Sequence, residues 1–285
     1  MIDRGRLTEI YARERQDFVA THPRSAAAYS RSDHLFGQVP MTWMNKNARD
    51  FPIYLERARG NRVWDIDGFE YVDFALGDTG AMAGHSPEAT VAALQHRVGA
   101  LGGTTTMLPT EDAEWVGAEL TRRFGLERWS FSLTATDANR WAIRLVRALT
   151  GRPKILFNSH CYHGSVDESL IVVGSDGDGM SRPGNVGEPV DVTLTSRVAE
   201  FNDLQGLERQ LAHGDVAAVL MEPALSNIGI VLPEPGYLEG GRELTRRYSV
   251  LPERSTVSPA RHLATVPSRR PAPTACWRTS STCTR

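Results

Sequence analysis

A row of apolar positions at helical spacing is the clearest pattern in the chain. The positions fall at i, i+3, i+4, i+7, i+8 and i+11, which predicts one apolar face of a helix. They are Ala138, Trp141, Ala142, Leu145, Val146 and Leu149. Gly151 and Pro153 follow and predict the end of the helix. Residues 131–133 form a short apolar strand pattern just before it, so a strand–turn–helix unit is expected.

The polar turn of that unit, residues 134–137, is a candidate anion site. Thr134 and Thr136 stand where the helix begins, and the first turn of a helix has unpaired N–H groups and partial positive charge. A phosphate group fits such a turn. The alternative is an ordinary strand–turn–helix without a ligand. The stretch alone favours that alternative, because helix N-termini are far more common than phosphate sites.

The rest of the chain alternates between strand and helix patterns. Residues 53–74 are short strand-like runs separated by Gly60-Asn61 and Asp67-Gly68, which is typical of β-hairpins. Residues 154–158 are predicted to form a buried strand. Residues 216–221 are a continuous apolar run of strand length, typical of a strand covered on both faces. Helices are predicted at 110–125, 203–211 and 238–248. This alternation predicts an α/β fold with a mainly parallel sheet.

The pattern divides the chain into three parts. Residues 1–52 are expected to form an N-terminal arm that begins with an amphipathic helix, and residues 53–248 an α/β domain opened by a β meander. Residues 249–285 are rich in Ser, Thr, Pro and Arg without any periodicity, so we expect a disordered tail. Residues 174–200, rich in Gly, Asp, Pro and Ser, are expected to form a long surface excursion.

Composition narrows the classes of function. The formal net charge is −2, which argues against binding to nucleic acid. No apolar run is long enough to span a membrane, and the N-terminus lacks the apolar segment of a signal peptide. The three cysteines, Cys161, Cys276 and Cys283, form no disulfide framework, so a cytoplasmic protein is expected. The chain has only two lysines, Lys46 and Lys154.

Candidate chemistry follows the first apolar strand run. Tyr162 and His163 lie just past its end, where open α/β sheets bind ligands, so they are candidates to contact a planar cofactor. The alternative is a loop with a half-buried tyrosine and a solvated histidine, and it is the favoured reading of these residues alone. His160, Cys161 and His163 also suggest a metal site, which is disfavoured because no second ligand pair has usable spacing.

A second candidate group follows the later strand run. Glu222 and Asn227 supply a carboxylate and an amide that are suited to orient a cofactor or substrate. The alternative is a turn shaped by Pro223 and Asn227. The chain has no G-x-S-x-G, Walker A or H-E-x-x-H motif, so serine hydrolysis and P-loop phosphoryl transfer are unsupported.

Six motifs in order resemble the class III pyridoxal-phosphate aminotransferases, with glutamate-1-semialdehyde aminomutase as the nearest branch. The resemblance covers residues 35–248. The motifs are Val63-Trp64-Asp65-Ile66-Asp67-Gly68 with Tyr71-Val72-Asp73-Phe74, Gly84-His85-Ser86-Pro87, Thr134-Ala135-Thr136-Asp137-Ala138-Asn139, Thr150-Gly151-Arg152-Pro153-Lys154-Ile155, Tyr162-His163-Gly164, and Glu222-Pro223 with Asn227-Ile228-Gly229.

The resemblance implies an incomplete large domain of the fold type I pyridoxal-phosphate transferases, so that residues 53–248 are a partial cofactor-binding domain. It implies the cofactor pyridoxal 5'-phosphate (PLP), a small-molecule amino donor and acceptor, and a homodimer in intact relatives. Seven cofactor-binding residues carry over. Three match the family's phosphate-binding turn: Thr134, Ala135 and Thr136. The other four lie on the side of the pyridine ring: Tyr162, which stacks on the ring, its neighbour His163, Asn227 near the ring hydroxyl, and Glu222, which supports the site.

The phosphate-binding motif departs from the family pattern. The family's Ser-Gly-Thr-Glu-Ala is replaced here by Thr134-Ala135-Thr136-Asp137-Ala138. Alanine in place of glycine restricts the backbone. We expect phosphate binding to survive, because the amides and a threonine remain.

The larger departure lies after Tyr248. The family's next elements are a strand ending in an aspartate that pairs with the pyridine nitrogen, and then the Schiff-base lysine. Residues 249–285 contain neither Asp nor Lys. We therefore expect an inactive, C-terminally truncated aminotransferase or aminomutase, with a shifted reading frame as one origin of the tail. The alternatives are a non-catalytic binding partner of a related full-length subunit, and an unstable fragment.

Overall fold

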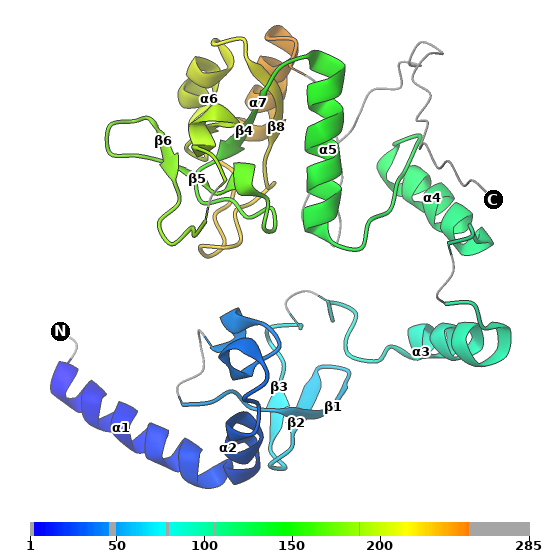
Figure 1. Ribbon diagram of the computed structural model, residues 1–285, viewed down its shortest axis with the longest axis vertical. Helices are drawn as coiled ribbons and strands as arrows, with labels where there is room; N and C mark the ends of the chain where they lie inside the picture. The colour runs from blue at the N-terminus through cyan, green and yellow to red at the C-terminus, as the bar shows by residue number, and fades with distance from the viewer. Residues whose placement is uncertain (1–2, 46–49, 78–79, 105–106, 188, 251–285) are drawn as a thin grey trace, which may run out of the picture. The chain divides into compact units, whose positions relative to one another are not determined.

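The computed structural model describes residues 3–45, 50–77, 80–104, 107–187 and 189–250. The chain divides into two compact units, Met1–Met107 and Leu108–Arg285 (Figure 1). The β meander lies in the first unit and the parallel sheet in the second. The domain boundaries expected at residues 52 and 248 stay predictions, and nearly all of the expected tail lies outside the described residues.

The first unit combines helices with a small antiparallel sheet. Its helices are α1 (Arg4–Thr21), α2 (Pro23–Ser30), the short η1 (Phe36–Gln38) and η2 (Thr42–Asn45), and α3 (Glu88–Gln95), which continues into the wider turn η3 (His96–Leu101). Its strands β1 (Leu55–Arg59), β2 (Arg62–Asp65) and β3 (Glu70–Val72) pair in that order. Both predicted hairpins are therefore confirmed.

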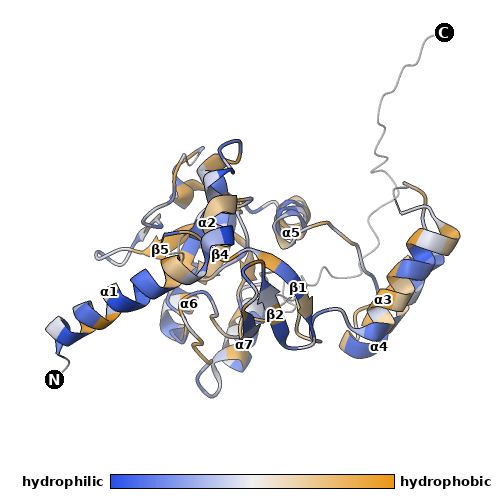
Figure 2. Ribbon diagram, turned by 90° about the horizontal axis from the view of Figure 1, so that it is seen from below, coloured by the Kyte–Doolittle hydropathy of each residue, from blue (hydrophilic) through white to orange (hydrophobic). Residues whose placement is uncertain are grey.

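The N-terminal helix is present as predicted, but it buries none of its residues. Figure 2 shows it as a mainly hydrophilic helix with scattered hydrophobic positions. Asp3 caps its start by accepting a hydrogen bond from the Arg6 N–H at 3.0 Å. The helix therefore forms from local signals, without a buried apolar face.

Asp67, in the β2–β3 turn, caps helix α2 from outside the helix. Its carboxylate accepts hydrogen bonds from the N–H groups of Arg24 (2.7 Å) and Ser25 (2.9 Å) and from the Ser25 hydroxyl (2.5 Å). The helix's own cap residue, His22, makes no side-chain cap bond. Burial acts to raise the pKa of Asp67, but these hydrogen bonds outweigh it and lower the pKa. The hairpin turn thereby fastens α2 to the meander.

The second unit contains the parallel sheet. Strands β7 (Ser196–Ala199), β4 (Lys154–Asn158) and β8 (Val216–Leu220) pair in parallel in the order β7-β4-β8, which confirms the predicted α/β class. A separate antiparallel pair joins β5 (Ile171–Val173) to β6 (Gly179–Ser181). The helices are α4 (Glu111–Phe124), α5 (Ala135–Thr150), α6 (Leu204–Leu211), α7 (Tyr237–Arg247), and the short η4 (Asp167–Ser169) and η5 (Val192–Leu194).

Both faces of the parallel sheet are covered. Alternate residues of β4 belong to two different apolar clusters. Ile155 and Phe157 pack in the cluster that includes residues of α5, and Leu156 packs in the cluster that includes residues of α6 and α7. Burying a side chain of this size contributes about 1.5–3 kcal/mol. Val250 is also buried in the second cluster. Burial on two faces thus explains the continuous apolar run of β8 and the buried strand predicted at residues 154–158.

The helix predicted from the apolar row is confirmed as α5. The apolar row of α5 is largely exposed, with Trp141 58% exposed, and the buried residues are Asn139, Ile143 and Val146. Periodicity predicts that a helix forms, whereas contact with the sheet decides which face is buried.

Two expectations from the sequence, both about strands, were wrong. Residues 131–133 form no strand, because a strand needs a hydrogen-bonded neighbour and none pairs with them in the described part of the chain; Leu133 is 99% exposed. Residues 174–200 are no simple excursion, since they include β6 and the sheet strand β7. Strand β7 begins with the polar residues Ser196 and Arg197, so the sequence pattern does not reveal that Val198 and Ala199 are buried.

Candidate functional site

The loops that follow β4 and β8 meet at one edge of the sheet. We call residues 159–165 the β4 loop and residues 221–227 the β8 loop. Glu222, only 1% exposed, accepts a hydrogen bond on Oε1 from the Tyr162 N–H at 2.6 Å. Its Oε2 accepts from the Ser226 N–H at 3.2 Å and the Ser226 hydroxyl at 2.9 Å. One buried carboxylate therefore joins the two loops, as expected where parallel strands end together.

The start of α5 is joined to the same β4 loop. Thr136 Oγ1 accepts a hydrogen bond from the Ser165 N–H at 3.1 Å, and Asn139 Nδ2 donates to the His163 carbonyl oxygen at 2.9 Å. Gly164 lies between them with φ +79°, and a Cβ there would overlap Thr136 Oγ1. Glycine is therefore required for this close approach.

The turn at the start of α5 is suited to a phosphate. Thr134 is the N-cap residue: its Oγ1 accepts from the Asp137 N–H (3.1 Å) and donates to the Asp137 carboxylate (2.9 Å). Within the described residues, the N–H groups of Ala135 and Thr136 donate no hydrogen bond. Ala135 is helical and has no positive φ, so alanine costs no backbone strain there. The residues present fit a phosphate group.

The ring-side candidates differ in exposure. The Tyr162 side chain is 52% exposed, whereas His163 is fully buried with its ring centroid 5.6 Å from that of Phe157. Asn227 is exposed beside Ser226, and its side chain makes no recorded hydrogen bond to the described residues. Burial raises the pKa of the Cys161 thiol to about 12, so it stays protonated.

The structure thus brings most of the predicted site residues into one hydrogen-bonded group. Thr134, Ala135 and Thr136 begin α5, which is bonded to the loop of Tyr162 and His163, and that loop is bonded to Glu222. Asn227 belongs to the group only through its neighbour in sequence. Their roles toward a cofactor stay predictions.

Sequence reasoning missed several residues that hold the site together. They are Asn139, Ser165, Arg182 and Ser226. Asn139 gave one usable signal, because a polar residue among the apolar positions of a core helix must find a partner when buried. The others contact the loops only through tertiary structure.

Neither lysine is found at this group of residues: Lys154 lies at the other end of β4, and Lys46 is not among the described residues. Lys154 begins β4 and pairs with Asp215 at 3.5 Å. The β4 loop is at the opposite end of that strand, about 13 Å away at the usual rise per residue. Lys46 lies outside the described residues. No lysine therefore lies at the candidate site within the described part of the chain.

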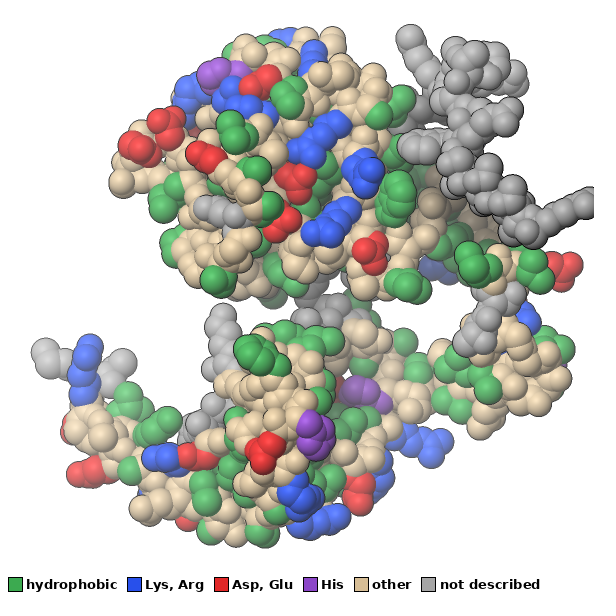
Figure 3. Space-filling model, in the orientation of Figure 1, with side chains coloured by type: hydrophobic (Ala, Val, Ile, Leu, Met, Phe, Trp, Pro, Cys, Tyr) green, Lys and Arg blue, Asp and Glu red, His purple; other side chains and the backbone are tan. Residues whose placement is uncertain are grey.

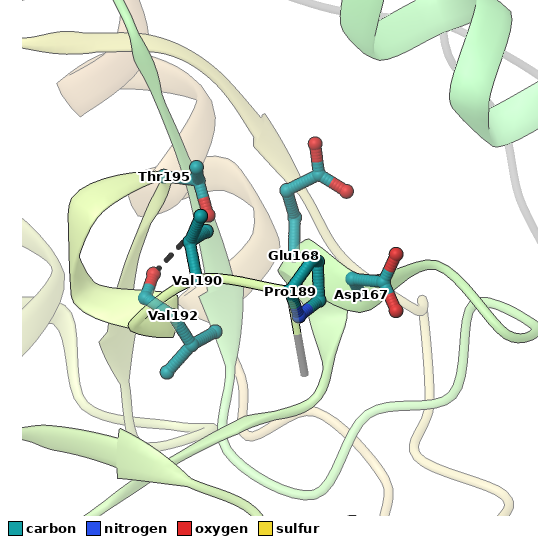
Figure 4. A pocket seen from close by; sticks show the side chains of 6 residues that line it. All are labelled: Asp167, Glu168, Pro189, Val190, Val192 and Thr195. Carbon is teal, nitrogen blue, oxygen red and sulfur yellow. Dashed lines mark hydrogen bonds between the residues drawn. The ribbon is translucent and has the colours of Figure 1, made fainter. Parts of the chain in front are cut away.

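A small cavity lies elsewhere in the second unit (Figure 4). Its volume is about 90 Å³, and it is lined by Asp167, Glu168, Pro189, Val190, Val192 and Thr195. None of these is a predicted site residue. Glu168 is already paired with Arg147 at 2.8 Å. The cavity is too small for a cofactor, since such pockets occupy roughly 300–1,000 Å³.

On the face of the second unit seen in Figure 3, basic and acidic side chains are interspersed, without a field of one sign. Among the described residues, no group of three His, Cys, Asp or Glu is placed to hold a metal ion. No described helix is long and apolar enough to cross a membrane.

The fold and the loop arrangement agree with comparisons to known proteins. The family model for class III aminotransferases matches residues 43–251. The chain therefore belongs to the class III aminotransferase family, whose cofactor is pyridoxal phosphate.

Several similar relatives are aminomutases. The chain is 36% identical over 237 residues to glutamate-1-semialdehyde 2,1-aminomutase of Desulfitobacterium hafniense, covering 80% of this chain and 54% of that one. The crystal structure of a glutamate-1-semialdehyde aminomutase from Pseudomonas aeruginosa matches with a TM-score of 0.83 and 48% identity, over 87% of this chain and 55% of that one. A lysine-to-alanine variant of that enzyme, in complex with PMP, matches equally well. The chain spans about half the length of these relatives.

Proposed function

We propose that this chain carries the phosphate-binding side of a PLP site, descended from an aminotransferase or aminomutase that acts on an amino acid or amino-ketone. The observation that supports it most is the network joining Thr136, Tyr162 and Glu222 at one edge of the sheet. In this proposal residues 53–248 are a partial cofactor-binding domain and residues 1–52 an arm. The tail that begins at residue 249 is outside the family apart from its first three residues, which the family model still matches.

The residues have distinct tasks in the proposal. The N–H groups of Ala135 and Thr136, at the positive end of α5, bind the phosphate, and the Thr136 hydroxyl has its hydrogen free to donate. Thr134 fixes the turn. The Tyr162 ring would contact the cofactor ring, with its neighbour His163 buried in the same loop, and Asn227 and Glu222 would complete and support the ring side. When bound, PLP supplies an electron sink for amino-group transfer.

We further propose that the chain is catalytically inactive. A lysine must hold the cofactor aldehyde and move a proton, and Lys154 lies at the wrong end of β4 and is paired with Asp215. The proposal also includes a cytoplasmic location, supported by the unpaired, buried Cys161.

A reduction experiment tests both parts of this proposal. The full chain is titrated with PLP while tryptophan fluorescence is followed, then treated with borohydride and analysed by mass spectrometry. We expect saturable binding and no stoichiometric, borohydride-stable link to a lysine. Absence of saturable binding contradicts the site, and a stable link at Lys154 or Lys46 contradicts inactivity.

A second candidate function is a non-catalytic subunit that binds a full-length relative, in a pair like the homodimer that the resemblance implies for intact relatives. The exposed apolar row Trp141, Leu145 and Leu149 on α5 favours it, because such rows are normally covered. Co-purification with a full-length aminomutase, lost in the Trp141→Glu variant, would support this function. If the Trp141→Glu variant still co-purifies with the full-length aminomutase, the apolar row of α5 is not the contact surface.

A further inference from the structure

Four backbone groups of the β4 loop are each held by a side chain from another part of the second unit. The bonds are Arg182 Nη2 to the Cys161 carbonyl, the Tyr162 N–H to Glu222 Oε1 at 2.6 Å, Asn139 Nδ2 to the His163 carbonyl at 2.9 Å, and the Ser165 N–H to Thr136 Oγ1 at 3.1 Å. A loop held at four points within five residues is fixed before any ligand binds.

Asn139 is the most informative of these side chains. It is fully buried, and it lies one helical turn after Ala135, on the helix whose first turn is the proposed phosphate site. Its amide reaches the carbonyl of the residue next to Tyr162. One rigid helix therefore carries both the phosphate-binding N–H groups and the contact that fixes the loop of the aromatic ring.

We propose that Asn139 is a positioning residue that sets the distance between the phosphate-binding turn and the Tyr162 ring. This inference rests on the proposed function. A ligand with both a phosphate and a ring, such as PLP, needs that distance, whereas inorganic phosphate uses only the start of α5. Arg182 acts on the same loop from the other side, through the Cys161 carbonyl.

The test compares Asn139→Ala with Ile143→Ala in the full chain. Ile143 is 3% exposed on the same helix and makes no hydrogen bond to the loop, so it reports loss of packing alone. Asn139→Leu keeps the branched shape of the side chain without its amide and serves as the second variant. The measurements are amide hydrogen exchange of residues 162–165 without ligand, and the affinities for PLP and for inorganic phosphate.

We expect exchange in residues 162–165 to rise about tenfold more in both Asn139 variants than in Ile143→Ala. We expect PLP affinity to fall about tenfold, while phosphate affinity stays within about twofold. Equal effects of Asn139→Ala and Ile143→Ala, or equal losses for PLP and phosphate, would overturn the inference. If the unaltered chain binds neither ligand, the proposed function fails, while the exchange comparison still decides whether Asn139 holds the loop.

Discussion

The carboxylate of Glu222 accepts a hydrogen bond from the backbone N–H of Tyr162 at 2.6 Å. The two residues follow neighbouring parallel strands, β8 and β4, and the carboxylate is almost wholly buried. A buried carboxylate is stable only when hydrogen bonds satisfy it, and here Tyr162 and Ser226 do so. The candidate site therefore depends on a hydrogen bond that joins the β4 loop to the β8 loop at one edge of the sheet.

Replacing Glu222 by alanine should lower the free energy of unfolding. The change leaves the N–H groups of Tyr162 and Ser226 without their acceptor, at a cost of about 1–3 kcal/mol. Glu222→Gln keeps one acceptor oxygen and should cost less. Urea denaturation measures both, with exposed Glu239→Ala as the control. Equal stability of Glu222→Ala and the control would show that the bond contributes nothing.

Replacing Gly164 by alanine should destabilise the chain more than the same change at Gly177. Both glycines have positive φ, which costs alanine about 1–2 kcal/mol. Only at Gly164 does the added Cβ overlap another side chain, Thr136, since nothing lies within 4 Å of a Cβ at Gly177. Thermal denaturation of both variants gives the difference. The double variant Gly164→Ala/Thr136→Ala should recover part of it, and no recovery would refute the close approach.

Replacing Asp67 by alanine should destabilise the first unit by about 1 kcal/mol, because α2 loses its cap. The pKa of Asp67 is lowered from its ordinary value of 3.8 in the folded chain. Its contribution is therefore present above pH 4 and is lost as the pH falls below the lowered pKa. Denaturation between pH 7 and pH 2 should show that the free energy of unfolding falls in acid for the unaltered chain, and falls less for Asp67→Asn. The same acid dependence in both would contradict the cap.

Much of the fold could be predicted because its signals are local. The helices α4, α5 and α6 begin and end at capping residues such as Thr110, Thr134, Asp203 and Gly151. The hairpins follow from their turn residues. Strand β7 and the buried face of α5 could not be predicted, because both depend on contacts with distant segments.

The site was predictable in part. Thr136, Tyr162 and Glu222 follow from their motifs, yet the bonds among them, and the role of Asn139 in holding the loop, become visible only in three dimensions. The position of the β4 loop depends on buried side chains, such as Asn139, whose contacts no local sequence pattern indicates. For the same reason, the exposed position of Asn227 could not be inferred from its motif.

The affinity of the full chain for PLP, measured by calorimetry beside Thr136→Val and Lys154→Ala, tests the central claim most directly. Loss of the Thr136 hydroxyl removes a hydrogen bond to a charged group, worth about 1.5–3 kcal/mol. We predict one-to-one binding that weakens at least about tenfold in Thr136→Val and is unchanged in Lys154→Ala. Unchanged binding in Thr136→Val, or its loss in Lys154→Ala, would contradict a phosphate site at the start of α5.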